Sequence, residues 1–106
     1  MRGDVYWVNL EPAIGGEIRK KRPAIIVSND AANKAANRVQ VVPLSSNVKR
    51  IDSWEARVTV GGRAQKAMAD QIRTIARERL MDKAGSLPGA EMIAVEKAIK
   101  VQLALA

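Results

Sequence analysis

The chain of 106 residues contains neither cysteine nor histidine. Without cysteine it can form no disulfide and no zinc site built on thiolates, which fits a reducing compartment. Without histidine it lacks the usual proton shuttle near neutral pH. Ser-His-Asp and Cys-His sites are therefore excluded, as is RNA cleavage by a pair of histidines.

Other chemical signatures are missing as well. The sequence has no P-loop and no G-x-G-x-x-G stretch, and its carboxylates are scattered without an Asp-x-Asp pattern. We therefore expect no metal site and no cofactor. No apolar run approaches the roughly 18–20 residues that span a membrane, and the N-terminus lacks the hydrophobic region of a signal peptide. We expect a cytoplasmic protein that does not enter the membrane.

The chain is rich in apolar residues and in positive charge. Hydrophobic residues make up 47% of it, enough for a small core, and we expect a single domain over residues 1–106. The formal net charge is +7, and the first 50 residues carry nine Lys/Arg against four Asp/Glu. Such an excess favours a polyanionic partner such as nucleic acid over an ordinary solvated surface.

Hydrophobic patterning predicts a sheet of short strands with few helices. Residues 76–83 are expected to hold a helical turn, and Gly61-Gly62 a turn between strands. Trp7 is expected in the core, and Trp54 either in the core or stacked on a base. The predicted strands are 4–10, 24–28, 38–45, 54–60 and 65–75, with a loop at 11–21, a short helix at 31–36 and a loop at 46–53.

A C-terminal amphipathic helix is predicted from Pro88 onward. Projected at 100° per residue, Met92, Val95, Ile99 and Leu103 form one apolar stripe. The apolar arc covers roughly half of the circumference, so it either covers the sheet of one monomer or also contacts another subunit. The expected fold is mainly β with helices (α+β): a strongly bent, mostly antiparallel sheet of five to seven strands with this helix.

A cluster of cations, Arg19 to Arg22, precedes the predicted strand that follows Pro23. Proline holds its predecessor Arg22 extended, and the planar guanidinium suits bidentate contact with a phosphate. Hydroxyls of Ser45 and Ser46, at the end of the next strand, are placed to reach the same anion. Glu17 on the preceding loop is a candidate base, provided that its pKa is raised.

Several motifs, in order along almost the whole chain, resemble the MazF/PemK family, the ribonuclease toxins of bacterial type II toxin–antitoxin systems. Each motif alone is weak, but their order and spacing together are specific. The motifs are Arg2-Gly3-Asp4-Val5-Tyr6-Trp7, Leu10-Glu11-Pro12, Gly15-Gly16-Glu17, Arg22-Pro23-Ala24-Ile25-Ile26-Val27-Ser28-Asn29-Asp30, Val42-Pro43-Leu44-Ser45-Ser46, Ala69-Asp70-Gln71-Ile72-Arg73-Thr74-Ile75 and the apolar C-terminal tail.

The resemblance implies an SH3-like small barrel that forms a homodimer. It implies a metal-independent, sequence-selective endoribonuclease of single-stranded RNA that leaves a 2′,3′-cyclic phosphate and a 5′-hydroxyl. It also implies a cognate antitoxin, with DNA binding by the joint complex. By position, the catalytic arginine is Arg22, the catalytic hydroxyl is Ser45 with Ser46 as the one-residue alternative, and the loop glutamate is Glu17.

The resemblance also implies a set of RNA contacts, among them a base-contacting acid–amide pair, Asp70 and Gln71. Gly16 stands where the family often has serine, so one loop hydroxyl contact is expected to be lost. The predicted RNA-binding residues are Gly16, Arg19, Lys20, Lys21, Ser46, Asn47, Lys49, Arg50, Asp70 and Gln71.

Attack by the RNA's own 2′-OH needs orientation and charge stabilisation rather than an enzyme nucleophile, which fits the missing residue types. Arg22 is a poor base because its pKa lies above ~12, so the proton acceptor is either Glu17 or a positioned water. Two other functions stay open: a gyrase poison like CcdB, which shares the fold class, and a non-catalytic nucleic-acid-binding barrel.

Overall fold

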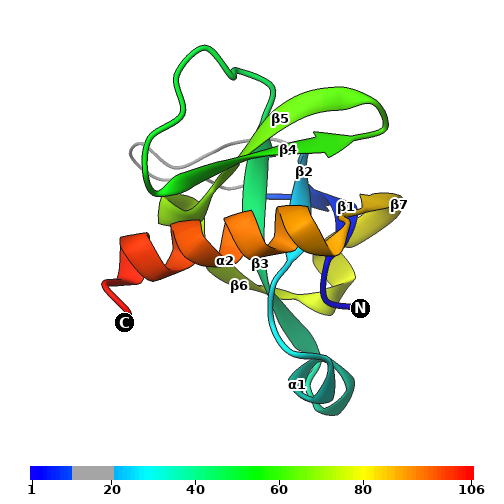
Figure 1. The fold of residues 1–106 in the computed structure, drawn as a ribbon. Helices are drawn as coiled ribbons and strands as arrows, with labels where there is room; N and C mark the ends of the chain where they lie inside the picture. The colour runs from blue at the N-terminus through cyan, green and yellow to red at the C-terminus, as the bar shows by residue number, and fades with distance from the viewer. Residues whose placement is uncertain (11–20) are drawn as a thin grey trace.

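The fold is organised around one long strand, β3 (Arg38–Ser45), which matches the predicted bounds. The computed structural model describes residues 1–10 and 21–106. Strand β3 pairs with β2 (Lys21–Ile26), β5 (Arg63–Met68) and β6 (Arg73–Ala76). Strand β1 (Asp4–Asn9) lies between β2 and β7 (Leu80–Ser86) and pairs with both. Strand β4 (Glu55–Val60) pairs with β5. All these pairings are antiparallel, and the strand order is β4-β5-β3-β2-β1-β7, with β6 beside β3 (Figure 1).

Both faces of the central strands are buried, which explains why their sequences are apolar without alternation. Ile25 and Val42 enter one core cluster, whereas their neighbours Ile26 and Val41 enter the other. Successive side chains of a strand point to opposite faces, so each strand supplies both clusters. The second cluster lies on the other face of the strongly bent sheet, and Ile75 of β6 completes it. The predicted SH3-like small barrel of mainly β class is confirmed.

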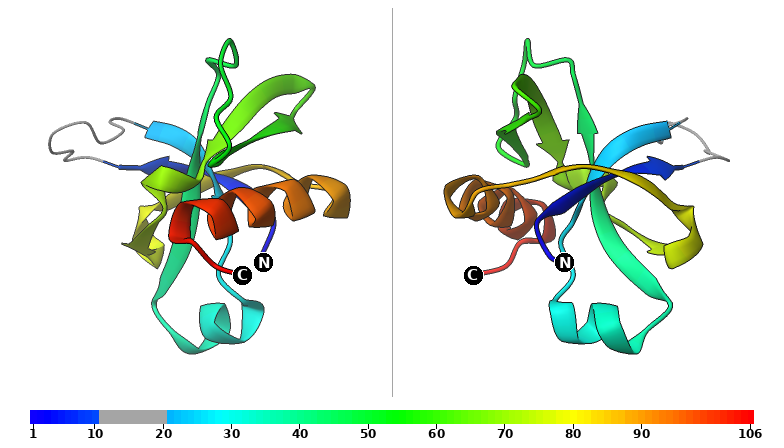
Figure 2. Two further views of the ribbon diagram at one scale, coloured as in Figure 1. Left: turned by 60° about the vertical axis from the view of Figure 1, so that its left-hand side comes forward. Right: turned by 90° about the vertical axis from the view of Figure 1, so that its right-hand side faces the viewer.

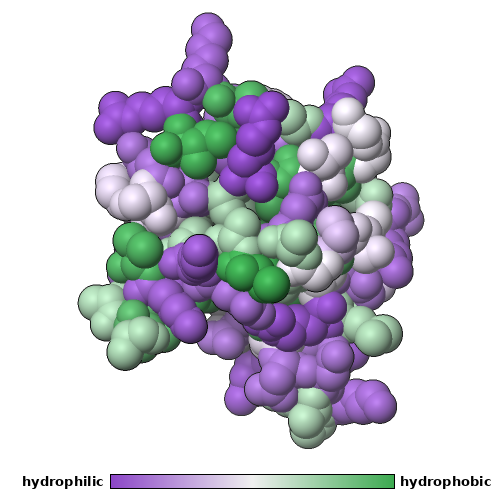
Figure 3. Space-filling model, viewed as in Figure 1, coloured by the Kyte–Doolittle hydropathy of each residue, from purple (hydrophilic) through white to green (hydrophobic). Residues whose placement is uncertain are grey.

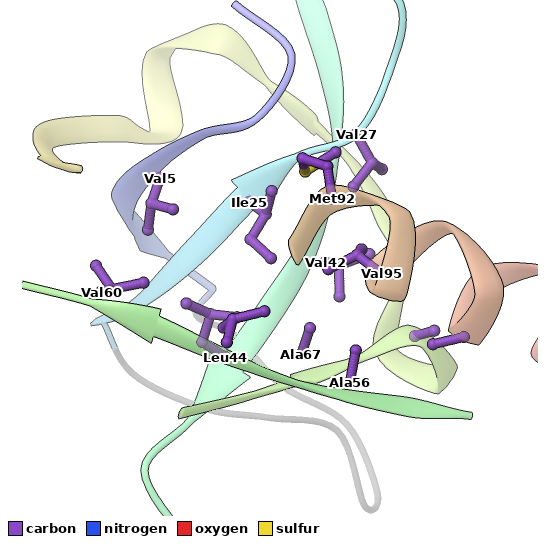
Figure 4. Close-up of a cluster of buried hydrophobic side chains, with 13 residues drawn as sticks. Val5, Ile25, Val27, Val42, Leu44, Ala56, Val60, Ala67, Met92 and Val95 are labelled. Atoms are coloured by element: carbon purple, nitrogen blue, oxygen red, sulfur yellow. The ribbon is translucent and has the colours of Figure 1, made fainter. Parts of the chain in front are cut away.

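The first core cluster lies between the sheet and α2 (Gly89–Leu103), which runs along one face of the sheet (Figures 2 and 4). Met92, Val95 and Ala98 are the buried residues of this helix, so the first half of the predicted stripe is confirmed as core. Pro88 is the N-cap of the helix rather than its first helical residue. Within the described residues, no helix has the length and apolar character needed to cross a membrane.

The short helix α1 (Asp30–Ala35) lies at the end of the molecule opposite the β4–β5 hairpin (Figures 1 and 2). The Asn29 side chain caps it by accepting a hydrogen bond of 2.7 Å from the backbone N–H of Ala32. Gly61 and Gly62, at φ of 57° and 78°, form the hairpin turn, as predicted. Positive φ at both positions is what a two-residue turn of this type requires.

Two strand predictions were wrong. The predicted strand 65–75 is interrupted by a 3₁₀ turn, η1 (Ala69–Gln71), because β5 pairs with the end of β3 while β6 pairs with its beginning. Strand β7 was missed; a 3₁₀ turn, η2 (Arg77–Arg79), precedes it where a helical turn was expected. The side chains of β7 are mostly exposed, so its backbone pairing with β1 leaves no apolar signal.

Candidate active site

Strand β2 begins earlier than predicted, and this moves Arg22 from a loop into the sheet. Lys21 and Arg22 are the first residues of β2, and Val8 of β1 is the cross-strand partner of Arg22. Regular pairing with β1 continues through Pro23, which lies opposite Trp7. The guanidinium of Arg22 is therefore carried by a rigid element, half-buried, rather than by a loop.

Arg22 and Ser45 lie at neighbouring ends of β2 and β3. The two strands pair from Ala24 to Ile26 and from Val41 to Pro43, and both residues lie two positions beyond this paired stretch. The guanidinium of Arg22 reaches the carbonyl oxygen of Leu44, the residue before Ser45. A guanidinium and a hydroxyl in this part of the fold can contact one phosphate group between them.

Pro23 has a second effect, on the carbonyl of Leu44. The backbone N–H of Val27 donates to Gln40 O at 2.9 Å, which identifies the hydrogen-bonding pairs of this ladder. The ladder ends at Ala24 and Pro43, and the next residue of β2, Pro23, has no N–H with which to extend it. Arg22 Nη1 lies 3.5 Å from the Leu44 carbonyl oxygen, a long contact that turns the guanidinium toward the end of β3.

A cavity of about 300 Å³ opens at the same strand ends. Three cations, Lys21, Arg22 and Arg63, belong to its wall. Among the residues that the structure describes, no carboxylate lines it, so the cavity favours an anion. Its described lining is Trp7, Lys21, Arg22, Pro23, Leu44, Ser46, Arg63, Ala64 and Gln65.

The two neighbouring serines face different surroundings. Ser46 is exposed and lines the cavity, whereas Ser45 is half-buried and its Oγ accepts a hydrogen bond of 3.2 Å from the backbone N–H of Asn47. Of the two serines, Ser46 shares the cavity with Arg22, whereas Ser45, adjacent to it in the chain, points to the opposite face of β3. That bond to Asn47 leaves the hydroxyl hydrogen of Ser45 available to donate to an anion.

The other predicted RNA contacts of the 46–53 loop lie outside this cavity. Lys49 is exposed, and Arg50 forms an exposed ion pair of 3.0 Å with Asp52. Lys66 Nζ donates to the Arg50 carbonyl at 3.0 Å and thereby ties the loop to β5.

The predicted acid–amide pair also lies apart from the cavity. Asp70 and Gln71 are part of η1, which packs against α2 and β3. Asp70 is exposed and Gln71 half-buried. Four other predicted site residues lie outside the described residues: Gly16, Glu17, Arg19 and Lys20.

Sequence reasoning missed three cavity residues: Trp7, Arg63 and Gln65. Trp7 was predicted to be core, but it is 42% exposed. Trp54, for which the core was one prediction, is 37% exposed. In β1, Val5 is on the face that α2 covers, and Trp7 continues that face beyond the core cluster. The alternation of a strand shows which face a residue is on, but it does not show how far α2 extends over that face.

Comparison with known proteins gives the family. Residues 1–103 match the family described as PemK-like, MazF-like toxin of type II toxin–antitoxin system. The chain is 39% identical to Endoribonuclease MazF9 of Mycobacterium tuberculosis, covering 98% of this chain and 96% of the relative. It is 30% identical to Endoribonuclease EndoA of Bacillus subtilis, covering 98% and 94%.

A solved structure shares the fold over the whole chain. An endoribonuclease in complex with its cognate antitoxin, from a mycobacterial species, superposes with a TM-score of 0.85 at 26% identity, covering 100% of this chain and 96% of that one. The family match and the two curated relatives each span nearly the entire sequence. The chain therefore belongs to the PemK-like, MazF-like family of type II toxin–antitoxin toxins.

Proposed function

We propose that this protein is the endoribonuclease toxin of a toxin–antitoxin system and that it cleaves single-stranded RNA without a metal ion. The two curated relatives described above are named endoribonucleases. The observation that carries the proposal is that Arg22 shares with two other cations a cavity at the ends of β2 and β3, where Ser45 and Ser46 also lie. This arrangement suits a phosphodiester and needs neither cysteine nor histidine.

In the proposed reaction, the 2′-oxygen of the RNA attacks the adjacent phosphorus and the bond to the 5′-oxygen breaks. The products are a 2′,3′-cyclic phosphate and a 5′-hydroxyl. The guanidinium of Arg22 stabilises the charge that develops on the phosphorane, and the hydroxyl of Ser45 donates to a non-bridging oxygen. Glu17 or a positioned water accepts the 2′-OH proton, and the leaving 5′-oxygen takes up a proton.

The test is a cleavage assay on defined RNAs in EDTA, with no ribosomes present, followed by sequencing of the 5′-hydroxyl ends. We expect cleavage under chelation at a limited set of sequences. RNA retention without cleavage would support the binding-module alternative, and DNA breaks that depend on gyrase would support a CcdB-like poison. Either result would refute the proposal.

A homodimer and an antitoxin complete the proposal. At the C-terminal end of α2, Val101, Leu103 and Leu105 are 52%, 49% and 57% exposed, and Figure 3 shows hydrophobic side chains gathered in this region. An exposed apolar patch of this kind marks a contact surface. We expect Leu103→Glu to shift the sedimentation coefficient from dimer to monomer, and an unchanged value would refute this interface.

The net charge of +7 suits a partner with an acidic segment. The solved mycobacterial endoribonuclease was found with its cognate antitoxin, and we propose that an antitoxin likewise neutralises this chain.

A further inference from the structure

We propose that the cavity beside Arg22 is a nucleobase subsite in which Trp7 stacks on a base of the RNA and Gln65 reads the edge of that base. This inference rests on the proposed function and adds to it a source of sequence selectivity. None of the three cavity residues Trp7, Arg63 and Gln65 was among the predicted site residues.

The cavity continues the inner face of the barrel beyond the end of its core. Figure 4 shows Ile25, Leu44 and Ala67 on neighbouring strands, facing the interior that α2 covers. Two residues farther along β2, Pro23 occupies this same face, with Trp7 as its cross-strand partner. The barrel therefore has an open mouth at this end, and mouths of β-barrels are common ligand sites.

The polar side of the cavity comes from β3 and β5. Leu44 pairs with Ala67 and Ser45 with Lys66, so the same register sets Ser46 opposite Gln65. Trp7 and Gln65 thus belong to one face, on strands separated by β2 and β3. An indole plane on one side and an amide on the other is the pairing that single-stranded RNA readers use for a splayed base.

Three side chains of the cavity wall are available to a ligand. Within residues 1–10 and 21–106, the side chains of Trp7, Arg63 and Gln65 have no hydrogen-bond or ion-pair partner. A glutamine amide offers both donors and an acceptor, so it can match a base edge. The Arg63 guanidinium adds the positive charge that a neighbouring phosphate requires.

The size and composition of the cavity favour one nucleotide base. Its volume of about 300 Å³ lies at the lower end of the range for small-molecule sites, roughly 300–1,000 Å³. Trp7 is its only aromatic lining residue among those described, and Tyr6 packs instead against the second core cluster. Since Arg22 lines the same cavity, the stacked base belongs to a nucleotide next to the phosphate that is cleaved.

The first experiment measures binding to an RNA that carries a 2′-deoxy nucleotide at the scissile position and so cannot be cleaved. Base–aromatic stacking is worth about 1–3 kcal/mol per base, so Trp7→Ala should raise Kd about 5- to 150-fold. Trp7→Phe, which keeps an aromatic face, should bind more tightly than Trp7→Ala. Ile93→Ala, 58% exposed on α2, is the matched control and should bind like the wild type.

The second experiment locates the base with RNAs that each lack one base. At one position, loss of the base should weaken binding to the wild type but not to Trp7→Ala. Equal losses in both proteins at every position would overturn the stacking assignment. Gln65→Leu should change the base preferred at that position in the sequenced cleavage ends, and an unchanged preference would overturn the role of Gln65.

Fluorescence gives a readout that does not depend on the fold of an alanine variant. In a Trp54→Phe protein, Trp7 is the sole tryptophan, and a stacked base should quench it. Absence of quenching at saturating RNA would overturn the proposal. Quenching by a polyglutamate peptide but not by RNA would also overturn it, in favour of a protein-contact surface.

Failure of the subsite and failure of the proposed function are distinguishable. If the wild type cleaves RNA and Arg22→Ala does not, but Trp7→Ala binds like the wild type, only the subsite is refuted. If the wild type neither binds nor cleaves any RNA, the proposed function falls, and the subsite with it.

Discussion

Replacing Arg22 by alanine tests the chemistry most directly. The guanidinium is half-buried at the strand end, so its interaction with a phosphorane is only partly screened by water. At a separation of about 4 Å and an effective dielectric constant of about 20, two unit charges attract by about 4 kcal/mol. Loss of that attraction slows the reaction about 10³-fold. Removal of one oxyanion-hole donor in other enzymes costs about 10²–10³, which agrees with this value.

The assay is single-turnover cleavage, at saturating enzyme, of an RNA labelled with a fluorophore and a quencher. We expect Arg22→Ala to lower the rate constant by about 10²–10³. The rate constant of Arg22→Lys should lie between those of the wild type and Arg22→Ala, because lysine keeps the charge but lacks the planar fork of the guanidinium. An unchanged rate constant in Arg22→Ala would refute the role of this residue.

The control for Arg22→Ala is Arg57→Ala. Arg57 is exposed on β4 and outside the described lining of the cavity. Its replacement removes the same unit of charge from the protein, so any general loss of attraction for RNA appears equally in both variants. Thermal melts of both variants separate a chemical effect from a folding one.

Three further predictions concern the hydroxyl, an ion pair and the core. Ser45→Ala should slow single-turnover cleavage about 10²-fold, whereas Ser46→Ala should leave it within a few-fold, and the reverse order would assign the hydroxyl to Ser46. Burial by itself raises the pKa of Asp4. The N-terminal ammonium, 3.0 Å away, and Lys83 of β7 outweigh this effect through hydrogen bonds and charge, so the pKa is lowered. Its stabilisation is therefore fully present above about pH 5 and is lost as the pH falls below about 4, so the melting temperatures of wild type and Asp4→Asn should differ at pH 7 and converge on acidification. Val95→Ala removes two methyl groups at a fully buried site on α2 and should lower the free energy of unfolding by about 2 kcal/mol in urea titrations, against less than about 0.5 for exposed Ile93→Ala.

Local patterns in the sequence predicted those elements whose side chains face the core. Strand β3 has the predicted bounds, because its apolar residues and the turn before it are local signals. The glycine turn and the capped helix α1 followed from residue types with narrow conformational preferences. By contrast, β7 forms through backbone hydrogen bonds to β1, and no side-chain pattern reports a partner that is far away in the sequence.

The site divides in the same way. Arg22 and Ser45 were predicted from their motifs, and they lie at neighbouring ends of β2 and β3. Asp70 and Gln71 were predicted with them, but η1 lies outside the cavity that Arg22 lines. Trp7 was assigned to the core because its strand alternates, although 42% of it is exposed. No sequence pattern pointed to Gln65 and Arg63, because their place in the cavity depends on how β5 pairs with β3.

The sequence by itself determined the fold class and the absence of cysteine and histidine chemistry, and it predicted an anion-binding arginine before Pro23. These follow from residue types and their local order, which set backbone preference, charge and available functional groups. Only the tertiary structure decided that Arg22 belongs to a strand and that Trp7, Ser46 and Gln65 line one cavity with it. The reason is that contacts between distant segments set the strand register and decide how far α2 extends over the sheet. Local sequence does not encode such contacts.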